Sequence, residues 1–279
     1  MKRAATLLDA ESMGMIRLLG IVVIMVSLSG SAAFALDPMG PPLARVREGQ
    51  FSVGADFSFS EMEFELSKGK WVTRDPDFDP PTGDPGDRKI KDFETIRLYG
   101  TIGYGLAKNW EAFIRLGAAK AEFGDSIWGA AGEDFDSNID FAIGGGVRAT
   151  FFEIPELNLQ IGGLFQANWS NFDGKLDAPI WPAPDFVEIS LAEAQIAIGA
   201  TYTWTNRVQV YGGPFVYYIR GDLEDIFTRF EYSWDIDEGP IFGGYLGARL
   251  QVAQDFIFNI EYQYSADATA IGAGLVLLY

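Results

Sequence analysis

The 279-residue sequence contains no histidine and no cysteine. Histidine is the usual general base of enzymes, because its charge changes near neutral pH. Without these two residues, Ser-His and Cys-His nucleophilic sites are excluded, as are zinc sites built from nitrogen and sulfur ligands. A mechanism that uses only carboxylates, as in glycosidases, stays open. We therefore expect no enzyme and no cofactor.

Positive charge is scarce as well. The chain has 21 lysines and arginines against 39 aspartates and glutamates, a formal net charge of −18. Nucleic acid is excluded as a partner, because its binding requires a basic surface. The remaining interpretations are a solvated acidic surface or an affinity for cations.

Long hydrophobic runs are also missing, apart from Leu18–Leu28. This run follows three basic residues and precedes small residues that end at Ala35. Such an order is typical of a secretory signal peptide, and the run is too short for a transmembrane helix. We expect a removed signal peptide, residues 1–35, and one mature domain, residues 36–279.

Alternating apolar and polar residues dominate the mature chain. This period of two predicts ten β-strands, each about ten to fifteen residues long. The predicted strands are Gln50–Ser60, Thr95–Leu106, Trp110–Ala118, Ile139–Phe151, Leu157–Trp169, Glu193–Trp204, Arg207–Tyr218, Phe242–Val252, Phe256–Tyr264 and Ile271–Tyr279.

The connections between these strands alternate between tight turns and long loops, which is typical of a transmembrane antiparallel up-and-down β-barrel. The alternative is a secreted, soluble β-sandwich. Met62–Val72 and Phe227–Ile236 alternate too. We interpret both as projections beyond the membrane; if both spanned it, the barrel would have twelve strands. The apolar phase slips near Ser60–Glu61, which predicts a bulge.

The last strand has apolar residues at every second position, including Leu275, Leu277 and the terminal Tyr279. It resembles the sorting signal of bacterial outer-membrane β-barrel proteins. The resemblance implies the cell outer membrane of a Gram-negative type envelope, contact with its lipid, and insertion by the barrel-assembly machinery. The strand number is similar to that of the omptin proteases, but the histidine that they require is absent.

Charged residues on the face opposite to the apolar one are predicted to point into the lumen. They are Arg97, Glu111, Arg115, Asp140, Arg148, Glu193, Arg207, Arg249 and Glu261. A barrel of this size has a narrow interior that side chains largely fill, and charges inside it must be paired. They form either an internal network that plugs the lumen or the lining of a selective channel.

The first long loop contains Asp75, Asp77 and Asp79, a spacing similar to the start of a calcium loop. Pro80 stands where such a loop needs glycine, so an EF-hand is excluded. A loose divalent-cation site is the interpretation that stays open, and the other acidic loops offer a surface for a ligand.

Our leading hypothesis is a non-enzymatic, monomeric outer-membrane barrel with a structural or surface-interacting role. The alternatives are a narrow porin-like channel for small solutes or cations, and a soluble β-sandwich that binds a ligand.

Overall fold

The computed structural model describes residues 37–73, 75, 77, 82–124, 134–177, 185–227 and 230–279. The predicted signal peptide lies outside these ranges. Within them, no helix is long and apolar enough to cross a membrane. The elements are β1 (Phe51–Thr73), β2 (Thr82–Gly83), β3 (Arg88–Ala107), β4 (Trp110–Gly124), β5 (Asp134–Ser137), β6 (Asp140–Ile154), the 3₁₀ helix η1 (Pro155–Leu157), β7 (Leu159–Asp177), β8 (Asp185–Thr205), β9 (Val208–Phe227), β10 (Phe230–Gln251), β11 (Phe256–Ser265) and β12 (Ala268–Leu278).

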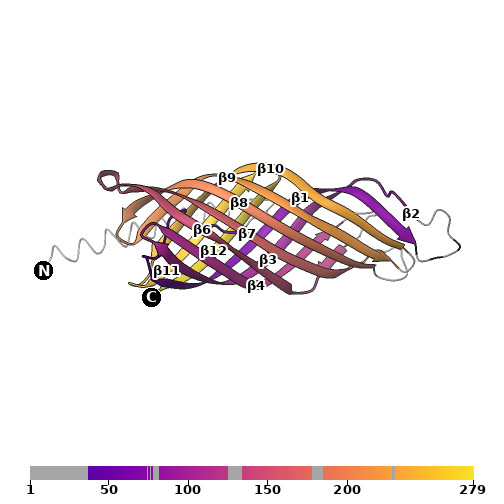
Figure 1. Cartoon of the computed structure of the whole chain (residues 1–279), viewed down its shortest axis with the longest axis horizontal. Coiled ribbons are helices and arrows are strands. Elements are labelled where there is room, and N and C mark those ends of the chain that lie inside the picture. The colour runs from indigo at the N-terminus through magenta and orange to yellow at the C-terminus, as the bar shows by residue number, and fades with distance from the viewer. Residues whose placement is uncertain are drawn as a thin grey trace, which may run out of the picture. The chain divides into compact units, whose positions relative to one another are not determined.

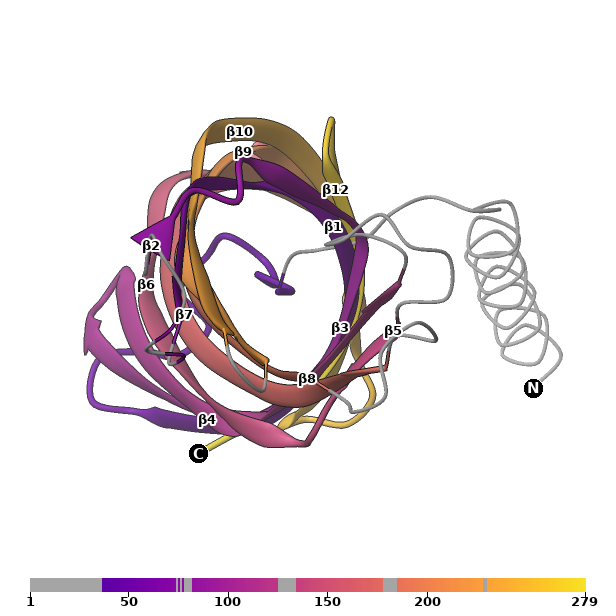
Figure 2. The same cartoon turned by 90° about the vertical axis from the view of Figure 1, so that its right-hand side faces the viewer.

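All of these strands belong to one antiparallel sheet that closes on itself (Figures 1 and 2). Closure comes from β1 and β12, which pair from Ser52 with Leu278 to Met62 with Ala268. Without the short strands β2 and β5, ten long strands form the ring. The predicted up-and-down barrel is confirmed, and a two-sheet sandwich is excluded because the ring is continuous.

The outer wall carries an apolar belt, and the two strands that end with it, β11 and β12, are 10 and 11 residues long. The large side chains of the belt are exposed, for example Leu98, Ile114 and Ile198. A strand tilted at about 45° needs this many residues to cross the hydrocarbon core, and a closed barrel leaves no backbone group unpaired in lipid. Aromatic residues such as Trp204 and Tyr218 border the belt. The chain is therefore a β-barrel of the bacterial outer-membrane class, resident in the cell outer membrane.

Above the belt, the same alternate residues of each strand continue to point inward and outward. The inward residues are now apolar and the outward residues are polar. In β1, Glu61 and Glu65 continue the outward row, while Phe64 and Leu66 point inward and are buried. The bulge that we predicted near Ser60–Glu61 is wrong for β1, which pairs with β12 without a break there; the nearest register shift, between Met62 and Phe64, has its extra residue in β3. The hydrophobic residues change faces because the surroundings change from lipid to water.

The barrel continues beyond the belt as an extension of eight strands. The β11–β12 hairpin ends at the belt, so β1 and β10 pair directly, from Leu66–Ile236 to Thr73–Phe230. The two additional alternating segments are thus continuations of β1 and β10. Next to β4, β5 takes the place of β6 and pairs with β4 and β7. Much of what the sequence suggested as long loop is strand.

An apolar core fills this extension. Phe93 of β3 lies 5.1 Å from Phe64 of β1 and 5.9 Å from Phe123 of β4, measured between ring centroids. It also lies 5.8 Å from Phe172 of β7, a strand on another part of the ring. Aromatic contacts therefore cross the interior of the extension.

Candidate functional site: a lumen filled by the N-terminal segment

Residues Asp37–Gln50, here called the N-terminal plug, precede β1; Asp37–Val46 lie inside the barrel, and Arg47–Gln50 are exposed. Figure 2 shows this indigo segment within the ring. Its side chains Asp37, Met39, Leu43 and Val46 are buried. Near its end the backbone is held at the wall, where the N–H of Gly49 donates to the carbonyl of Gly105. The lumen of the belt is thus occupied by the chain's own residues.

The carboxylate of Asp37 lies among basic and polar side chains of the wall. Its Oδ1 is 3.3 Å from Nη1 of Arg97 and accepts a hydrogen bond of 2.9 Å from the Ser58 hydroxyl. Its Oδ2 is 4.0 Å from Arg115. Arg97 also pairs with Glu193 at 2.9 Å. Buried charges of opposite sign are therefore matched at this level.

The plug backbone is also bound. Gln166 and Gln263 donate to the carbonyl of Asp37, at 3.1 and 2.9 Å. In the other direction, the N–H groups of Met39 and Gly40 donate to the two carboxylate oxygens of Glu261, at 2.9 and 2.8 Å. Charge-assisted hydrogen bonds of this kind are the strong ones, so they define the path of the plug.

A second ionic cluster forms around Glu111, which is fully buried. Arg45 of the plug contacts it at 2.8 Å and Arg148 of β6 at 3.1 Å. The Arg148 guanidinium also lies 4.1 Å from the ring centroid of Phe113. One carboxylate thus holds the plug and two wall strands together.

Two glycines in the wall allow the plug to approach closely. A Cβ atom on Gly162 would lie 2.0 Å from the backbone oxygen of Pro42, and one on Gly272 would lie 2.5 Å from the ring of Pro38. A larger residue at Gly272 would push the plug away, and one at Gly162 would also clash with the backbone oxygen of Ala149 in the wall, at 2.5 Å. These glycines therefore shape the wall to the plug.

The structure brings together six of the nine charged residues that the sequence placed in the lumen. These are Arg97, Glu111, Arg115, Arg148, Glu193 and Glu261. Arg249 lies on an inward position of β10 and is half-buried. Asp140 and Arg207 lie elsewhere. Asp140 is at the start of β6, where it accepts from the Asp173 N–H. Arg207 is exposed in the turn between β8 and β9, because the alternation ends there.

Sequence reasoning missed Asp37 and Arg45, the two charges that the plug contributes. The segment has no period of two, so no strand pattern drew attention to it. Buried Met39, Leu43 and Val46 recur every three or four residues, a weak sign that the segment packs against something.

The predicted cation site is only partly described. Asp75 and Asp77 lie after β1, where the Asp77 N–H donates to Oδ1 of Asp75 at 3.1 Å; Asp79 lies outside the described residues. In the described part of the chain, no three acidic, histidine or cysteine residues are grouped so as to hold a metal ion. A loose divalent site at these aspartates stays a prediction.

The acidic outer surface of the extension is partly neutralised. Lys68 contacts Asp235 at 2.9 Å. This hydrogen bond raises the pKa of Lys68 and lowers the pKa of Asp235. The predicted sorting residues lie at the opposite end, where Leu275, Leu277 and Tyr279 face outward from β12.

Comparisons with known proteins found distant similarity to solved structures. The outer membrane protease OmpT from Escherichia coli gives a TM-score of 0.43 at 12% identity, covering 82% of this chain and 97% of that chain. OprG from Pseudomonas aeruginosa gives 0.40 at 10%, covering 84% and 97%. The toluene transporter TbuX from Ralstonia pickettii gives 0.39 at 13%, covering 90% and 95%. No family model and no curated protein matches the sequence.

Proposed function

We propose that this protein is a non-enzymatic outer-membrane barrel with a closed lumen, which holds an acidic extension outside the cell in a structural or surface-interacting role. The observation that carries the proposal is the N-terminal plug. It fills the polar lumen and uses Asp37 and Arg45 to complete the wall's ion pairs.

The extension supports the same conclusion independently. Its interior is mainly apolar: Phe93, Phe172 and Trp234 are among its fully buried side chains, and Asp225 is a buried charged one. A solute would have to pass a polar plug and then a hydrophobic core. In the belt, a cavity beside Pro38, Met39 and Glu261 measures about 10 Å³, the lower limit for one water molecule.

The alternative function, a narrow channel for small solutes or cations, draws its support from the same charged wall. It requires the plug to leave and the apolar core to open. Single-channel conductance in planar bilayers separates the two functions. We expect no stable steps from the wild-type protein, and regular ion-selective steps would overturn the closed-lumen proposal.

A variant that lacks residues 38–48 sharpens this test. We expect it to stay silent as well, because the apolar core of the extension still excludes water. Its folding is checked by the gel mobility of unboiled against boiled protein, which changes for a closed barrel. Conductance steps from the variant but not from the wild type would show that the plug alone closes the lumen. They would overturn the expectation that the apolar core of the extension also closes it.

We further propose that residues 1–35 are removed on export, that the barrel-assembly machinery recognises the last strand, and that the barrel is a monomer. Mass spectrometry of the protein from outer membranes tests the first point. A measured mass equal to that of residues 36–279 supports removal, and a mass equal to that of the full chain contradicts it.

A further inference from the structure

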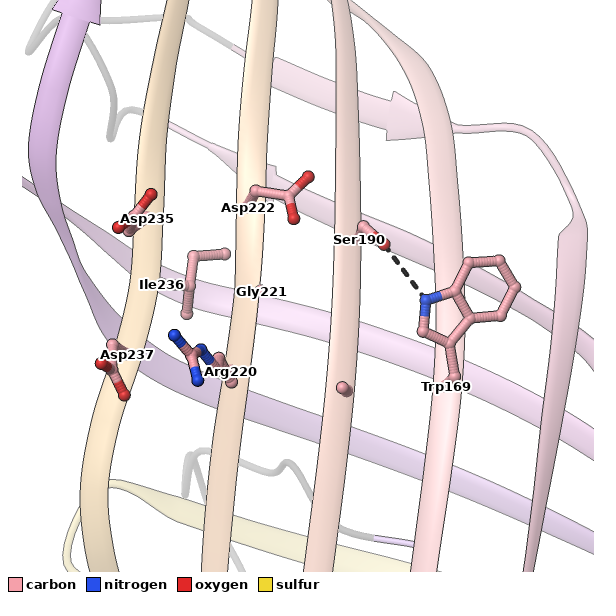
Figure 3. Close-up of a pocket in the computed structure, with 9 residues that line it drawn as sticks. Trp169, Ser190, Arg220, Gly221, Asp222, Asp235, Ile236 and Asp237 are labelled. Carbon is pink, nitrogen blue, oxygen red and sulfur yellow. Dashed lines mark hydrogen bonds between the residues drawn. The ribbon is translucent and has the colours of Figure 1, made fainter.

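A depression of about 380 Å³ lies on the outer wall of the barrel and crosses β7, β8, β9 and β10. Figure 3 shows its lining. Trp169 lies on one side, Asp235 and Asp237 on the other, and Arg220 and Asp222 between them. None of these side chains belongs to the lumen, so the depression is separate from the plug.

The depression exists because its floor is made of small residues. Ser190, Ala192 and Gly221 lie between the larger side chains. A Cβ atom on Gly221 would be 2.0 Å from the backbone oxygen of Ser190, so glycine is needed for the two strands to come this close. Trp169 donates from Nε1 to the Ser190 hydroxyl at 3.2 Å, which orients the indole.

The residues on either side of the depression show where it lies along the barrel axis. Toward the belt, the outward neighbours are Ala194 and Tyr218; toward the extension, they are Glu188 and Glu224. The depression is therefore at the boundary between hydrocarbon and water, where lipid headgroups lie.

Its charges form a specific pattern. Arg220 is exposed and makes no hydrogen bond or ion pair with any residue in the described ranges, unlike Lys68, which pairs with Asp235 at 2.9 Å. Two carboxylates flank this guanidinium: Asp222 follows two residues later on the same face of β9, and Asp237 is its partner on β10. A guanidinium that makes no direct ion pair within the described part of the chain thus lies between two carboxylates, and its charge also acts on Asp235 in the same depression.

We propose that this depression binds a zwitterionic phosphoethanolamine headgroup. The phosphate contacts the Arg220 guanidinium, which matches two phosphate oxygens at once, and the ammonium contacts Asp222. The acyl chains then extend along the belt past Ala194 and Tyr218. A headgroup with only negative charge would meet the two carboxylates, and one with only positive charge would meet Arg220.

The same headgroup chemistry occurs on a glycerophospholipid and on a lipid A phosphate that carries ethanolamine. Native mass spectrometry of the detergent-solubilised barrel can separate these sources. The probes are phosphatidylethanolamine and phosphatidylglycerol with identical acyl chains, and lipid A with and without phosphoethanolamine. We expect roughly tenfold higher occupancy by the ethanolamine form of at least one pair, the size of one charge-assisted contact.

Variants assign the contacts. Arg220→Gln should remove binding of the preferred lipid, and Asp222→Asn should remove the preference for ethanolamine while some binding remains. Lys120→Gln is the matched control, because Lys120 is an outward cation already paired with Glu122 and Asp136. It should bind like the wild type.

Three results would overturn the proposal. They are equal occupancy within both lipid pairs, an Arg220→Gln variant that binds like the wild type, and loss of all binding when divalent cations are chelated, which would indicate a metal bridge. None of them depends on whether the lumen conducts.

Discussion

At the scale of single residues, the lumen is held together by carboxylates that each bind more than one partner. Glu111 contacts Arg45 of the plug and Arg148 of the wall, and no water-exposed surface remains on it. A buried ion pair of this kind adds little net stability, but the loss of one partner leaves uncompensated charge.

We expect Glu111→Ala to destabilise the barrel by about 3–5 kcal/mol, because two buried guanidinium groups lose their counter-ion. Urea unfolding in lipid vesicles measures this change. Glu156→Ala, in the exposed helix η1, is the control and should change stability by less than about 0.5 kcal/mol. A similarly small effect of Glu111→Ala would contradict the conclusion that Glu111 is the counter-ion of Arg45 and Arg148.

Glu61 lies just above the belt, next to Asp92 and Glu94 of β3. Partial burial and a hydrogen bond with Asp92 raise its pKa to about 7. A carboxyl with a raised folded pKa binds more protons in the folded state, so stability falls as the pH rises from about 4.5 to 7. Above about pH 7, this loss of stability is complete.

Glu61→Gln should therefore lower the sensitivity of the barrel to pH. The measurement is the urea midpoint of wild type and variant at pH 5.5 and pH 8. We expect the midpoint of the wild type to fall more over this interval than that of the variant. Equal changes in both proteins would show that Glu61 does not titrate in this range.

At the scale of elements, the outward residues of each long strand face lipid in the belt and water in the extension. β4 presents Ile114 and Leu116 to lipid, and then Lys120 and Glu122 to water from the same outward row. The position along the strand therefore decides whether an outward residue should be apolar.

We expect Ile114→Arg to destabilise the barrel by about 2–4 kcal/mol, since Ile114 lies in the middle of the belt and an arginine there faces lipid. Val72→Arg, on an outward position of the extension in β1, should be tolerated. Refolding into vesicles followed by urea unfolding compares the two. Equal tolerance would place the belt elsewhere.

At the scale of the whole molecule, the plug brings residues that precede β1 into the interior of the ring. Because the protein has no cysteine, one introduced thiol reports on a single place. Met39→Cys should react slowly with a maleimide, since Met39 is only 1% exposed.

Adding Gly272→Val should speed this labelling by at least about tenfold, because the new side chain occupies the space of the Pro38 ring, next to Met39 in the plug. Gly239→Val is the matched control, since no atom lies within 4 Å of a Cβ there. Fast labelling without any wall substitution would mean that the plug does not stay in the lumen.

The sequence predicted the ring well and its contents only in part. A period of two is a local signal, so the ten strands, the apolar belt and inward residues such as Arg97 could be read from it. Which partner Arg97 finds could not be read, because Glu193 lies 96 residues away and on another strand. The plug was missed because it is irregular, and its contacts exist only once the ring has closed.

The reversal of polarity along β1 has a consequence for how strictly the strands are aligned. A slip of one residue turns every side chain of a strand to the opposite face. In an ordinary transmembrane strand, that error places polar groups in lipid. Here it would also place Phe64 and Leu66 in water and Glu61 and Glu65 inside the extension. Misalignment is thus penalised at both ends of the same strand, which favours a single register over the whole length of the barrel.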